Sequence, residues 1–417
     1  MNAASLPRGL FIVVATLAAC GSPASDDPAA RAERVHREAI VIDGHNDLPW
    51  RIREAFGGSL GALDLARRHE DGHTDLPRLQ EGGVDAQFFA AYVPVDYIGR
   101  GALRVCLEQI DLIHRLAERY PELEMAYTAA DVRRIAAAGR IAALVGIEGG
   151  HCIENSIGAL RKVYDLGARY MTLTHANTLD WADAATDRAR HQGLTSFGEE
   201  VVREMNRLGM LVDLSHVSPE TMRDAIRVSA APVIFSHSSA RAVADHVRNV
   251  PDDVLRLVQA NGGVVMINFY SGFVVPEGAE IMAGMFDVMR DLRARYPNDD
   301  AAYARALDAW RAAHPVPRGD VGILADHIDH VVRIAGVDHV GLGSDYDGVS
   351  VLPEGMEDVS RFPTLTEELL RRGYSESDVK QILGGNLLRA FEAAEQVAAR
   401  IRAERPPSEA RLVAPTP

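Results

Sequence analysis

Eight short apolar runs, each followed by a longer amphipathic segment, constrain the fold of this chain more than any other feature. The runs are residues 39–47, 84–93, 141–150, 168–177, 209–218, 231–240, 262–270 and 339–348. Near-continuous apolar runs separated by helical segments are typical of buried parallel strands. The segment 197–209 shows the helical half of this rhythm, with apolar residues at helical spacing and a final Gly209. The pattern predicts an α/β fold, a (β/α)8 TIM barrel.

Reactive side chains follow seven of the eight runs, which favours a closed barrel over its alternative, a doubly wound open sheet. In a barrel the functional residues gather where strands end and βα loops begin, whereas an open sheet binds ligands at one switch point. The strand-end residues are His45 with Asp47, Glu148, His175, His216, His237, Asn268 with Tyr270, and Asp345.

Five of these residues form a pattern that suits metal ions. His45 and Asp47 are two apart, so on a strand they point to the same face. His216 and His237 each follow an apolar run and one Ser. With Glu148 they make a set of imidazoles and carboxylates that suits zinc, or cobalt or manganese. Because one catalytic zinc takes fewer ligands, we expect two ions that share a bridging carboxylate and hold a hydroxide between them.

The bridging ligand is predicted to be Glu148. Some barrel hydrolases use a carboxylated lysine, but this chain has only Lys162 and Lys380, and both lie in helical patterns. Glu148 ends the third predicted strand, from which it could reach both ions.

A series of motifs in this sequence resembles those of the renal (membrane) dipeptidase family of zinc dipeptidases, peptidase family M19. The motifs are DGHNDLP, GIEGGH, LTHANTLDWAD, VDLSHVS, PVIFSHSSA, RNVPDDVL and GLGSDYDGV, and the resemblance runs from Ile40 to Phe391. It implies an amidohydrolase-like, metal-dependent barrel that is a homodimer. The implied reaction is hydrolysis of dipeptides, including those with a D-residue at the C-terminal side.

The resemblance also implies the metal ligands. His45 and Asp47 would bind the first zinc, Glu148 would bridge, and His216 and His237 would bind the second.

Three further residues take roles from the resemblance. His175 would contact the substrate carbonyl and stabilise the oxyanion, and Arg248 would bind the C-terminal carboxylate of the substrate. Asp345 would move a proton beside the bridging hydroxide, with Asp347 as a competitor for this role. Together with Glu148, Asp345 and His175 form the predicted catalytic set.

The ends of the chain are predicted to lie outside the barrel. Residues 1–19 have the pattern of a signal peptide, and LAAC before Gly21 resembles a bacterial lipobox with Cys20 as the lipidated residue. Residues 20–34 are predicted as a flexible tether, 35–395 as the catalytic barrel domain and 396–417 as a disordered tail. We therefore expect a protein anchored by lipid in the bacterial cell envelope, on the periplasmic face of the outer membrane.

Two longer segments interrupt the barrel pattern, at 48–83 and 271–325. Long βα loops cover an active site or contact a second subunit, and the sequence does not choose between these. The second segment is long compared with the mammalian members of the family that the chain resembles.

Composition limits the partners. The net charge of -15 argues against nucleic acid and against an anionic membrane surface, so contact with a membrane is expected only through the lipid anchor. Two other functions stay open: another barrel amidohydrolase acting on a lactone, phosphoester or cyclic amide, and a solute-binding lipoprotein. A disulfide between Cys106 and Cys152 is also left open.

Overall fold

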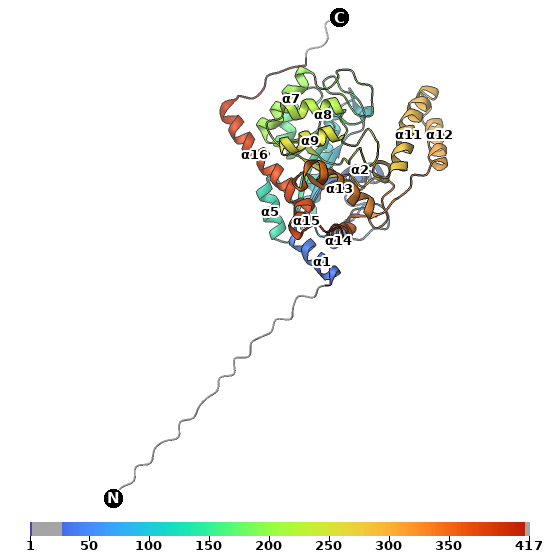
Figure 1. Cartoon of the computed structure of the whole chain (residues 1–417). Coiled ribbons are helices and arrows are strands. Elements are labelled where there is room, and N and C mark those ends of the chain that lie inside the picture. Colours follow the sequence, from blue (N-terminus) through green and yellow to red (C-terminus); the bar gives the residue numbers. More distant parts are fainter. Residues whose placement is uncertain (2–26, 413–417) are drawn as a thin grey trace.

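The chain forms a closed parallel β-barrel surrounded by helices (Figure 1). The computed structural model describes Met1 and residues 27–412. The strands are β1 Val41–Asn46, β2 Val84–Tyr92, β3 Leu123–Met125, β4 Ile141–Glu148, β5 Ala168–Thr172, β6 Leu211–Asp213, β7 Ile234–Phe235, β8 Val264–Ile267 and β9 Val340–Leu342. Their order is β2-β1-β9-β8-β7-β6-β5-β4-β3, and pairing of β2 with β4 closes the ring. The predicted (β/α)8 barrel is confirmed, and the open sheet is excluded.

Each of the eight apolar runs contains one strand of the barrel. The short strand β3, which pairs with the start of β4 outside the ring, was not predicted. Strands β6 and β7 are much shorter than their runs because side chains take over the hydrogen bonds of the backbone there. The Ser236 N–H donates to the Asp213 carboxylate at 2.7 Å, and the His237 N–H donates to the Ser215 hydroxyl at 3.0 Å.

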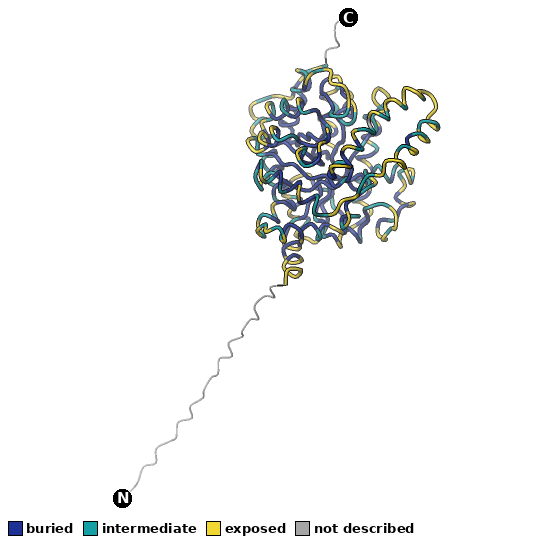
Figure 2. Tube along the Cα trace, turned by 45° about the vertical axis from the view of Figure 1, so that its right-hand side comes forward, coloured by how far each residue is buried: buried dark blue, intermediate teal, exposed yellow. Residues whose placement is uncertain are grey.

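The strands are apolar on both faces because both faces are covered. Along β4, Ala142 and Leu144 belong to one buried cluster, and Ala143 and Val145 belong to another. The first cluster also contains Leu387, Leu388 and Phe391 from the last long helix. Figure 2 shows the buried barrel in dark blue, with exposed residues confined to the periphery. The alternation gives the barrel a filled interior and an outer layer that packs on helices.

The helices of the outer layer follow the strands in sequence. They are α4 Ala102–Arg119, α5 Ala129–Ala137, α6 Ile157–Asp165, α7 Ser196–Leu208, α8 Pro219–Val228, α9 Asp252–Asn261, α13 Val321–Ala335, α14 Phe362–Arg371, α15 Glu376–Lys380 and α16 Asn386–Glu404. Helix α7 agrees with the prediction for 197–209: Thr195 caps its start, and Gly209 ends it at a φ of 86°.

Both long connections contain helices. Residues 48–83 form α2 Leu48–Phe56 and α3 Leu76–Glu81. Residues 271–325 form α10 Ser271–Val274, α11 Pro276–Arg295 and α12 Asp300–Ala313, and they contain the start of α13. Helices α11 and α12 form a hairpin that projects beside the barrel (Figure 1), and Figure 2 shows this hairpin largely exposed or half-buried.

The ordered domain is longer than predicted at both ends. Helix α1, Pro28–Glu38, begins inside the predicted tether because Ala32, Val35 and His36 are buried against the domain, where His36 binds Thr366; exposed Arg31 and Arg34 also pair with Glu376. Helix α16 continues through the predicted start of the tail to Glu404. The sequence of both segments is charged and rich in alanine, and these contacts with distant helices are not visible in it.

The predicted signal peptide, Cys20 and residues 20–26 of the tether lie outside the described residues. None of the helices in the described residues combines the length and the apolar character that a membrane span requires. Cys106 and Cys152 are buried and are not joined by a disulfide.

The close contact between the residues that directly follow β9 and β7 gives a first prediction. A Cβ atom on Gly343 would lie 1.8 Å from the backbone oxygen of Ser236. We expect Gly343→Ala to destabilise the fold by about 1–3 kcal/mol or more, because backbone atoms cannot move away as a flexible side chain could. Thermal unfolding followed by circular dichroism would measure the change.

A suitable control is Gly158→Ala in α6, where the nearest atom to the added Cβ is the Ser156 hydroxyl at 3.5 Å. This variant should be as stable as the parent or slightly more stable. Equal melting temperatures for the two variants would contradict the packing argument.

Candidate active site

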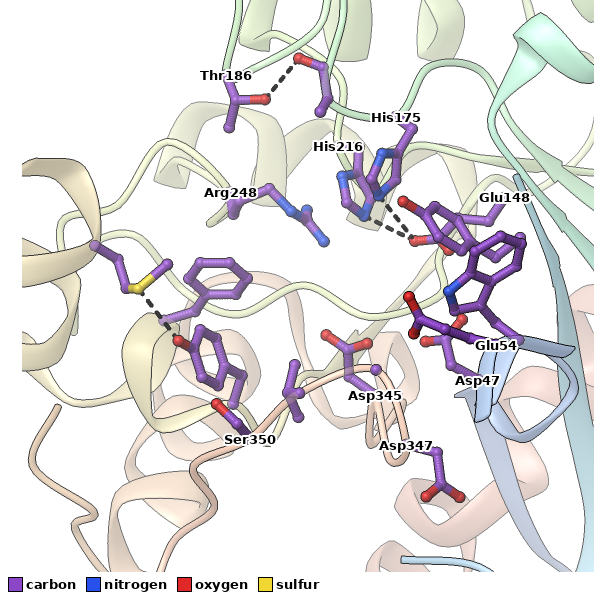
Figure 3. A pocket seen from close by; sticks show the side chains of 18 of the residues that line it. Asp47, Glu54, Glu148, His175, Thr186, His216, Arg248, Asp345, Asp347 and Ser350 are labelled. Carbon is purple, nitrogen blue, oxygen red and sulfur yellow. Dashed lines mark hydrogen bonds and ion pairs between the residues drawn. The ribbon is translucent and has the colours of Figure 1, made fainter. Parts of the chain in front are cut away.

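The strand-end residues singled out in the sequence meet at one end of the barrel (Figure 3). Because all the strands of the barrel are parallel, their carboxyl ends open at the same face. The structure brings together all eight residues predicted for the site: His45, Asp47, Glu148, His175, His216, His237, Arg248 and Asp345.

Glu148 lies between two groups of ligand atoms. Its Oε2 is 3.6 Å from His45 Nε2, and that nitrogen is 3.3 Å from Asp47 Oδ2. Its Oε1 is 3.0 Å from His216 Nε2 and 3.5 Å from His237 Nε2. A third group combines His45 and His237 with Asp345. Each oxygen of Glu148 therefore faces a different set of imidazoles, as a bridging carboxylate would.

The polar atoms of this cluster fit bound cations. His45 Nε2 and Asp47 Oδ1 are buried without a hydrogen-bond partner among the described residues. His216 Nε2 and His237 Nε2 face each other at 2.9 Å. A neutral imidazole carries only one ring proton, so two neutral rings have few protons with which to form a hydrogen bond to each other. Orphaned buried ligand atoms are costly unless a bound group satisfies them. Imidazole and carboxylate together favour zinc and related divalent ions.

The imidazoles of the cluster differ in protonation. Burial, together with the positive charge of Arg248, lowers the pKa of His216 well below its ordinary value, so this imidazole is neutral at pH 7. Burial raises the pKa of Asp47 to about 7, the His45 imidazole opposes this rise, and Glu148 adds to it. A neutral imidazole is the form that coordinates a metal ion, whereas Glu148 and Asp47 help to raise the pKa of His45 well above its ordinary value, so a bound cation would displace the His45 proton.

A second layer of side chains orients the imidazoles. His45 Nδ1 is 2.8 Å from the Tyr170 hydroxyl. His237 Nδ1 is 2.8 Å from the Ser236 hydroxyl, which in turn donates to Asp213 Oδ2 at 2.6 Å. These contacts engage the Nδ1 atoms and leave each Nε2 directed into the cluster.

The supporting residues were missed by sequence reasoning. Asp43 lies before His45 in the apolar run 39–47, and Asp213 lies before His216 in the apolar run 209–218. An Asp at the apolar end of a strand was the available signal, because such a buried carboxylate needs several donors nearby.

His175 stands beside the cluster and faces the cavity. Its Nε2 is 3.6 Å from Glu148 Oε1, and its ring lies between those of Tyr92 and His216. Burial lowers its pKa to about 4. A neutral imidazole in this position can donate one hydrogen bond to a ligand.

Arg248 comes from the loop between β7 and α9 and is only 2% exposed. Its hydrogen bonds are long, at 3.3 Å to the His237 carbonyl and 3.5 Å to the Ser238 hydroxyl. Burial lowers its pKa to about 10, while Asp345 and Glu148 oppose the shift. No acidic side chain of the described residues makes a direct ion pair with it. A buried guanidinium without a direct counter-ion is a binding site for an anionic group.

Asp345 and Asp347 have different surroundings. Asp345 Oδ2 accepts from Asn268 at 2.8 Å, and the residue lies within ligand distance of His45 and His237. Asp347 accepts from the His73 N–H at 2.8 Å and lies 3.7 Å from Arg51. Asp345 is therefore the acid of the pair that faces the cluster of predicted ligands.

Three residues of the site have an unusual backbone conformation. Asp345, Asp347 and His216 have φ angles of 66°, 64° and 68°, in the left-handed region that non-glycine residues avoid. Such strain persists where the surrounding contacts fix the conformation, and it is common at functional sites.

A cavity of about 560 Å³ opens in front of these residues. Its remaining wall includes Trp50 and Glu54 of α2, Tyr92 of β2, Phe273 of α10, Met282 of α11 and Arg311 of α12. Sequence reasoning missed these residues, although Tyr92 closes an apolar run. Both long connections therefore contribute to the pocket.

The comparisons with known proteins agree with this geometry. The model of the membrane dipeptidase family, peptidase family M19, matches residues 29–405. Dipeptidase 3 from Mus musculus is 41% identical over 378 residues, which cover 89% of this chain and 68% of that protein. The resemblance inferred from the motifs is thereby confirmed.

Two solved structures are similar over most of the chain. The probable dipeptidase PvdM from Pseudomonas aeruginosa has a TM-score of 0.76 and 26% identity, covering 89% of this chain and 99% of its own. A metallo peptidase from Rhodobacter sphaeroides, liganded with a phosphinate mimic of the dipeptide L-Ala-D-Ala, has a TM-score of 0.69 and 25% identity. That match covers 86% of this chain and 100% of the Rhodobacter chain.

The hydrogen bonds behind His237 give a second prediction. In Asp213→Asn, an amide NH2 or a weaker carbonyl acceptor would replace the carboxylate that binds Ser236 and Thr172. We expect affinity for zinc to fall about 10–100-fold, because the imidazole loses its fixed orientation. Competition with a chromophoric chelator would measure this.

Asp291→Asn, on the exposed face of α11, is the matched control and should bind zinc as the parent does. Unchanged zinc affinity in Asp213→Asn, with only a lower melting temperature, would show that Asp213 stabilises the barrel and does not orient the ligand.

Proposed function

Since the chain belongs to the membrane dipeptidase family, peptidase family M19, we propose that it hydrolyses the peptide bond of free dipeptides with two zinc ions. One ion would be held by His45 and Asp47, the other by His216 and His237, with Glu148 shared by both. Cobalt or manganese would suit the same ligands. When bound, the ions would supply a hydroxide at neutral pH and a Lewis acid for the scissile carbonyl.

The observation that carries the proposal is the position of Arg248. It is a buried guanidinium that faces the cavity across from the ligand cluster (Figure 3). A planar guanidinium binds a carboxylate through two parallel hydrogen bonds. A substrate with its carboxylate at Arg248 and its peptide bond at the metal cluster is short, which favours a dipeptide over a longer peptide.

The other polar residues fit the steps of amide hydrolysis. Attack on the carbonyl places negative charge on its oxygen, and His175 can donate a hydrogen bond to that atom. The leaving amine needs a proton, which Asp345 can receive at the metal cluster and pass on. Asn268 fixes the Asp345 carboxylate for this role through the contact at 2.8 Å.

The substrate range is proposed to include a D-residue at the C-terminal side. The support is the family resemblance and the ligand of the Rhodobacter sphaeroides metallo peptidase, which mimics L-Ala-D-Ala.

We further propose that Cys20 is lipidated and that the protein is anchored in the bacterial cell envelope, at the periplasmic face of the outer membrane. The support is the LAAC sequence before Gly21. A homodimer is proposed on the family resemblance.

The proposed activity predicts the outcome of a substrate panel. Zinc-loaded protein should release free amino acids from L-L and L-D dipeptides. N-acetylated and C-amidated forms of the same dipeptides should be much poorer substrates, because each lacks one charged terminus. Chromatography of the released amino acids would measure both. Cleavage of none of them, with turnover of a lactone or a phosphoester, would replace the dipeptidase assignment by another amidohydrolase activity.

The role of Arg248 predicts a selective loss. Arg248→Met should lower kcat/KM for free dipeptides by about 30-fold or more, since the carboxylate loses a buried charged partner. It should change the slow cleavage of C-amidated dipeptides far less, because these have no carboxylate to bind.

Arg256→Met, an exposed position on α9, is the control and should leave both reactions unchanged. A similar loss for free and amidated substrates in Arg248→Met would mean that Arg248 supports the metal cluster and does not bind the carboxylate.

A further inference from the structure

The charges of the cavity wall are divided between two sides. The acidic residues of the wall are Asp47, Glu54, Glu148, Asp345 and Asp347, and Asp47, Glu148 and Asp345 belong to the predicted ligand cluster. Figure 3 shows Glu54 beside Asp47, across the cavity from Arg248. Glu54 makes no ion pair within the described residues. The basic residues of the wall are Arg248, which already has a role in the proposed function, and Arg311, which has none.

Arg311 belongs to the helical hairpin and not to the barrel. Within the described residues its ion pair is with Asp308 on the same helix, at 3.5 Å, and the two side chains are 53% and 72% exposed. An ion pair this exposed contributes little. The guanidinium of Arg311 is therefore available to a ligand in the cavity.

The hairpin is fixed to the barrel at the pocket. The Tyr270 hydroxyl donates to the sulfur of Met282 in α11 at 3.2 Å. Leu307 of α12 is buried, and a Cβ on Gly284 of α11 would contact Trp310 at 4.0 Å. Arg311 directly follows this packed tryptophan. Its backbone is therefore held beside the cavity even though its side chain can move.

A row of aromatic residues connects the two arginines. The Arg248 guanidinium lies 5.5 Å from the centre of the Phe273 ring, and Phe273 packs edge-on against Tyr270 at 4.8 Å. The Tyr270 phenol lies within the field of Arg311, which opposes the rise in its pKa that burial causes. Tyr270 also donates to Met282 of α11, which packs against α12, so these aromatic residues lead from Arg248 to the hairpin that carries Arg311.

This arrangement indicates which substrate residue Arg311 meets. In the proposed function, on which this inference rests, Arg248 binds the carboxylate of the second residue of the dipeptide. The side chain of that residue starts one bond from the carboxylate and can extend along Phe273 and Tyr270. Arg311 lines the same cavity, and its long, half-exposed side chain can turn toward the end of that substrate side chain.

We propose that Arg311 is a specificity-determining residue that selects dipeptides whose second residue has an acidic side chain, aspartate or glutamate. The same acidic side chain at the first residue is disfavoured, because that position faces Asp47 and Glu54. The pocket therefore distinguishes two dipeptides of the same composition and opposite order.

The test compares kcat/KM for Ala-Asp, Ala-Asn and Asp-Ala, with the second residue in both L- and D-forms. The zinc-loaded protein should prefer Ala-Asp over Ala-Asn and over Asp-Ala, each by about tenfold, the effect of one hydrogen bond to a charged group. Arg311→Gln should remove the preference for Ala-Asp over Ala-Asn and leave kcat/KM for Ala-Asn within about twofold of the parent. Added salt should weaken the preference in the parent.

Arg305→Gln, an exposed position on the same helix that does not line the cavity, is the matched control and should keep the preference. Equal rates for Ala-Asp and Ala-Asn in the parent, or a loss in Arg311→Gln that is the same for both, would overturn the inference and leave the dipeptidase assignment intact. Cleavage of none of the dipeptides by the parent would overturn the proposed function and this inference with it.

Discussion

The structure depends on one buried carboxylate, Glu148, whose two oxygens face the imidazoles of four histidines from four different strand ends. Desolvation disfavours its negative charge, while the neighbouring histidines hold its pKa well below the ordinary value. Only a closed barrel can direct side chains from opposite parts of a sheet toward one point. Glycine at position 146 contributes to this closure, because a Cβ there would lie 2.0 Å from the ring of Tyr170, the residue that contacts His45.

Two further carboxylates, Asp43 and Asp213, have equivalent roles in different parts of the barrel. Asp43 accepts from the N–H and hydroxyl of Ser344 at 2.7 and 2.6 Å, and Asp213 accepts from the N–H and hydroxyl of Ser236 at the same two distances. Asp345 follows Ser344 and His237 follows Ser236, and both were predicted to belong to the site. Each aspartate therefore joins neighbouring strands where the backbone ladder has ended, and it fixes the start of a loop that would otherwise move. This explains how a two-residue strand such as β7 can position a ligand.

The sequence predicted what depends on local pattern. Apolar runs with a final histidine or acid predicted the eight strands and the residues that meet at the mouth, although their roles stay predictions. It did not predict what depends on distant contacts. Buried Val35 and His36 hold α1 against the rest of the domain, and His36 binds Thr366 across more than 300 residues of sequence, so a helix lies where a tether was expected. Similarly, nothing in the sequence around Arg311 shows that α12 returns to the pocket, because this follows from the packing of α12 on α11.

Pocket residues on the barrel strands are therefore more tightly packed than pocket residues on the two long connections. Residues from strand ends, such as Glu148 and His237, are almost fully buried and make contacts on several sides, so a substitution there disturbs the predicted ligands and their neighbours together. Glu54 and Arg311 come from α2 and α12, are exposed, and line the cavity. A change at these positions can alter the charge that meets a substrate without moving a metal ligand. If the strands carry the chemistry and the long connections carry the recognition, members of the family with the same predicted metal ligands could act on different dipeptides. This is expected where function is added to a rigid scaffold through loops.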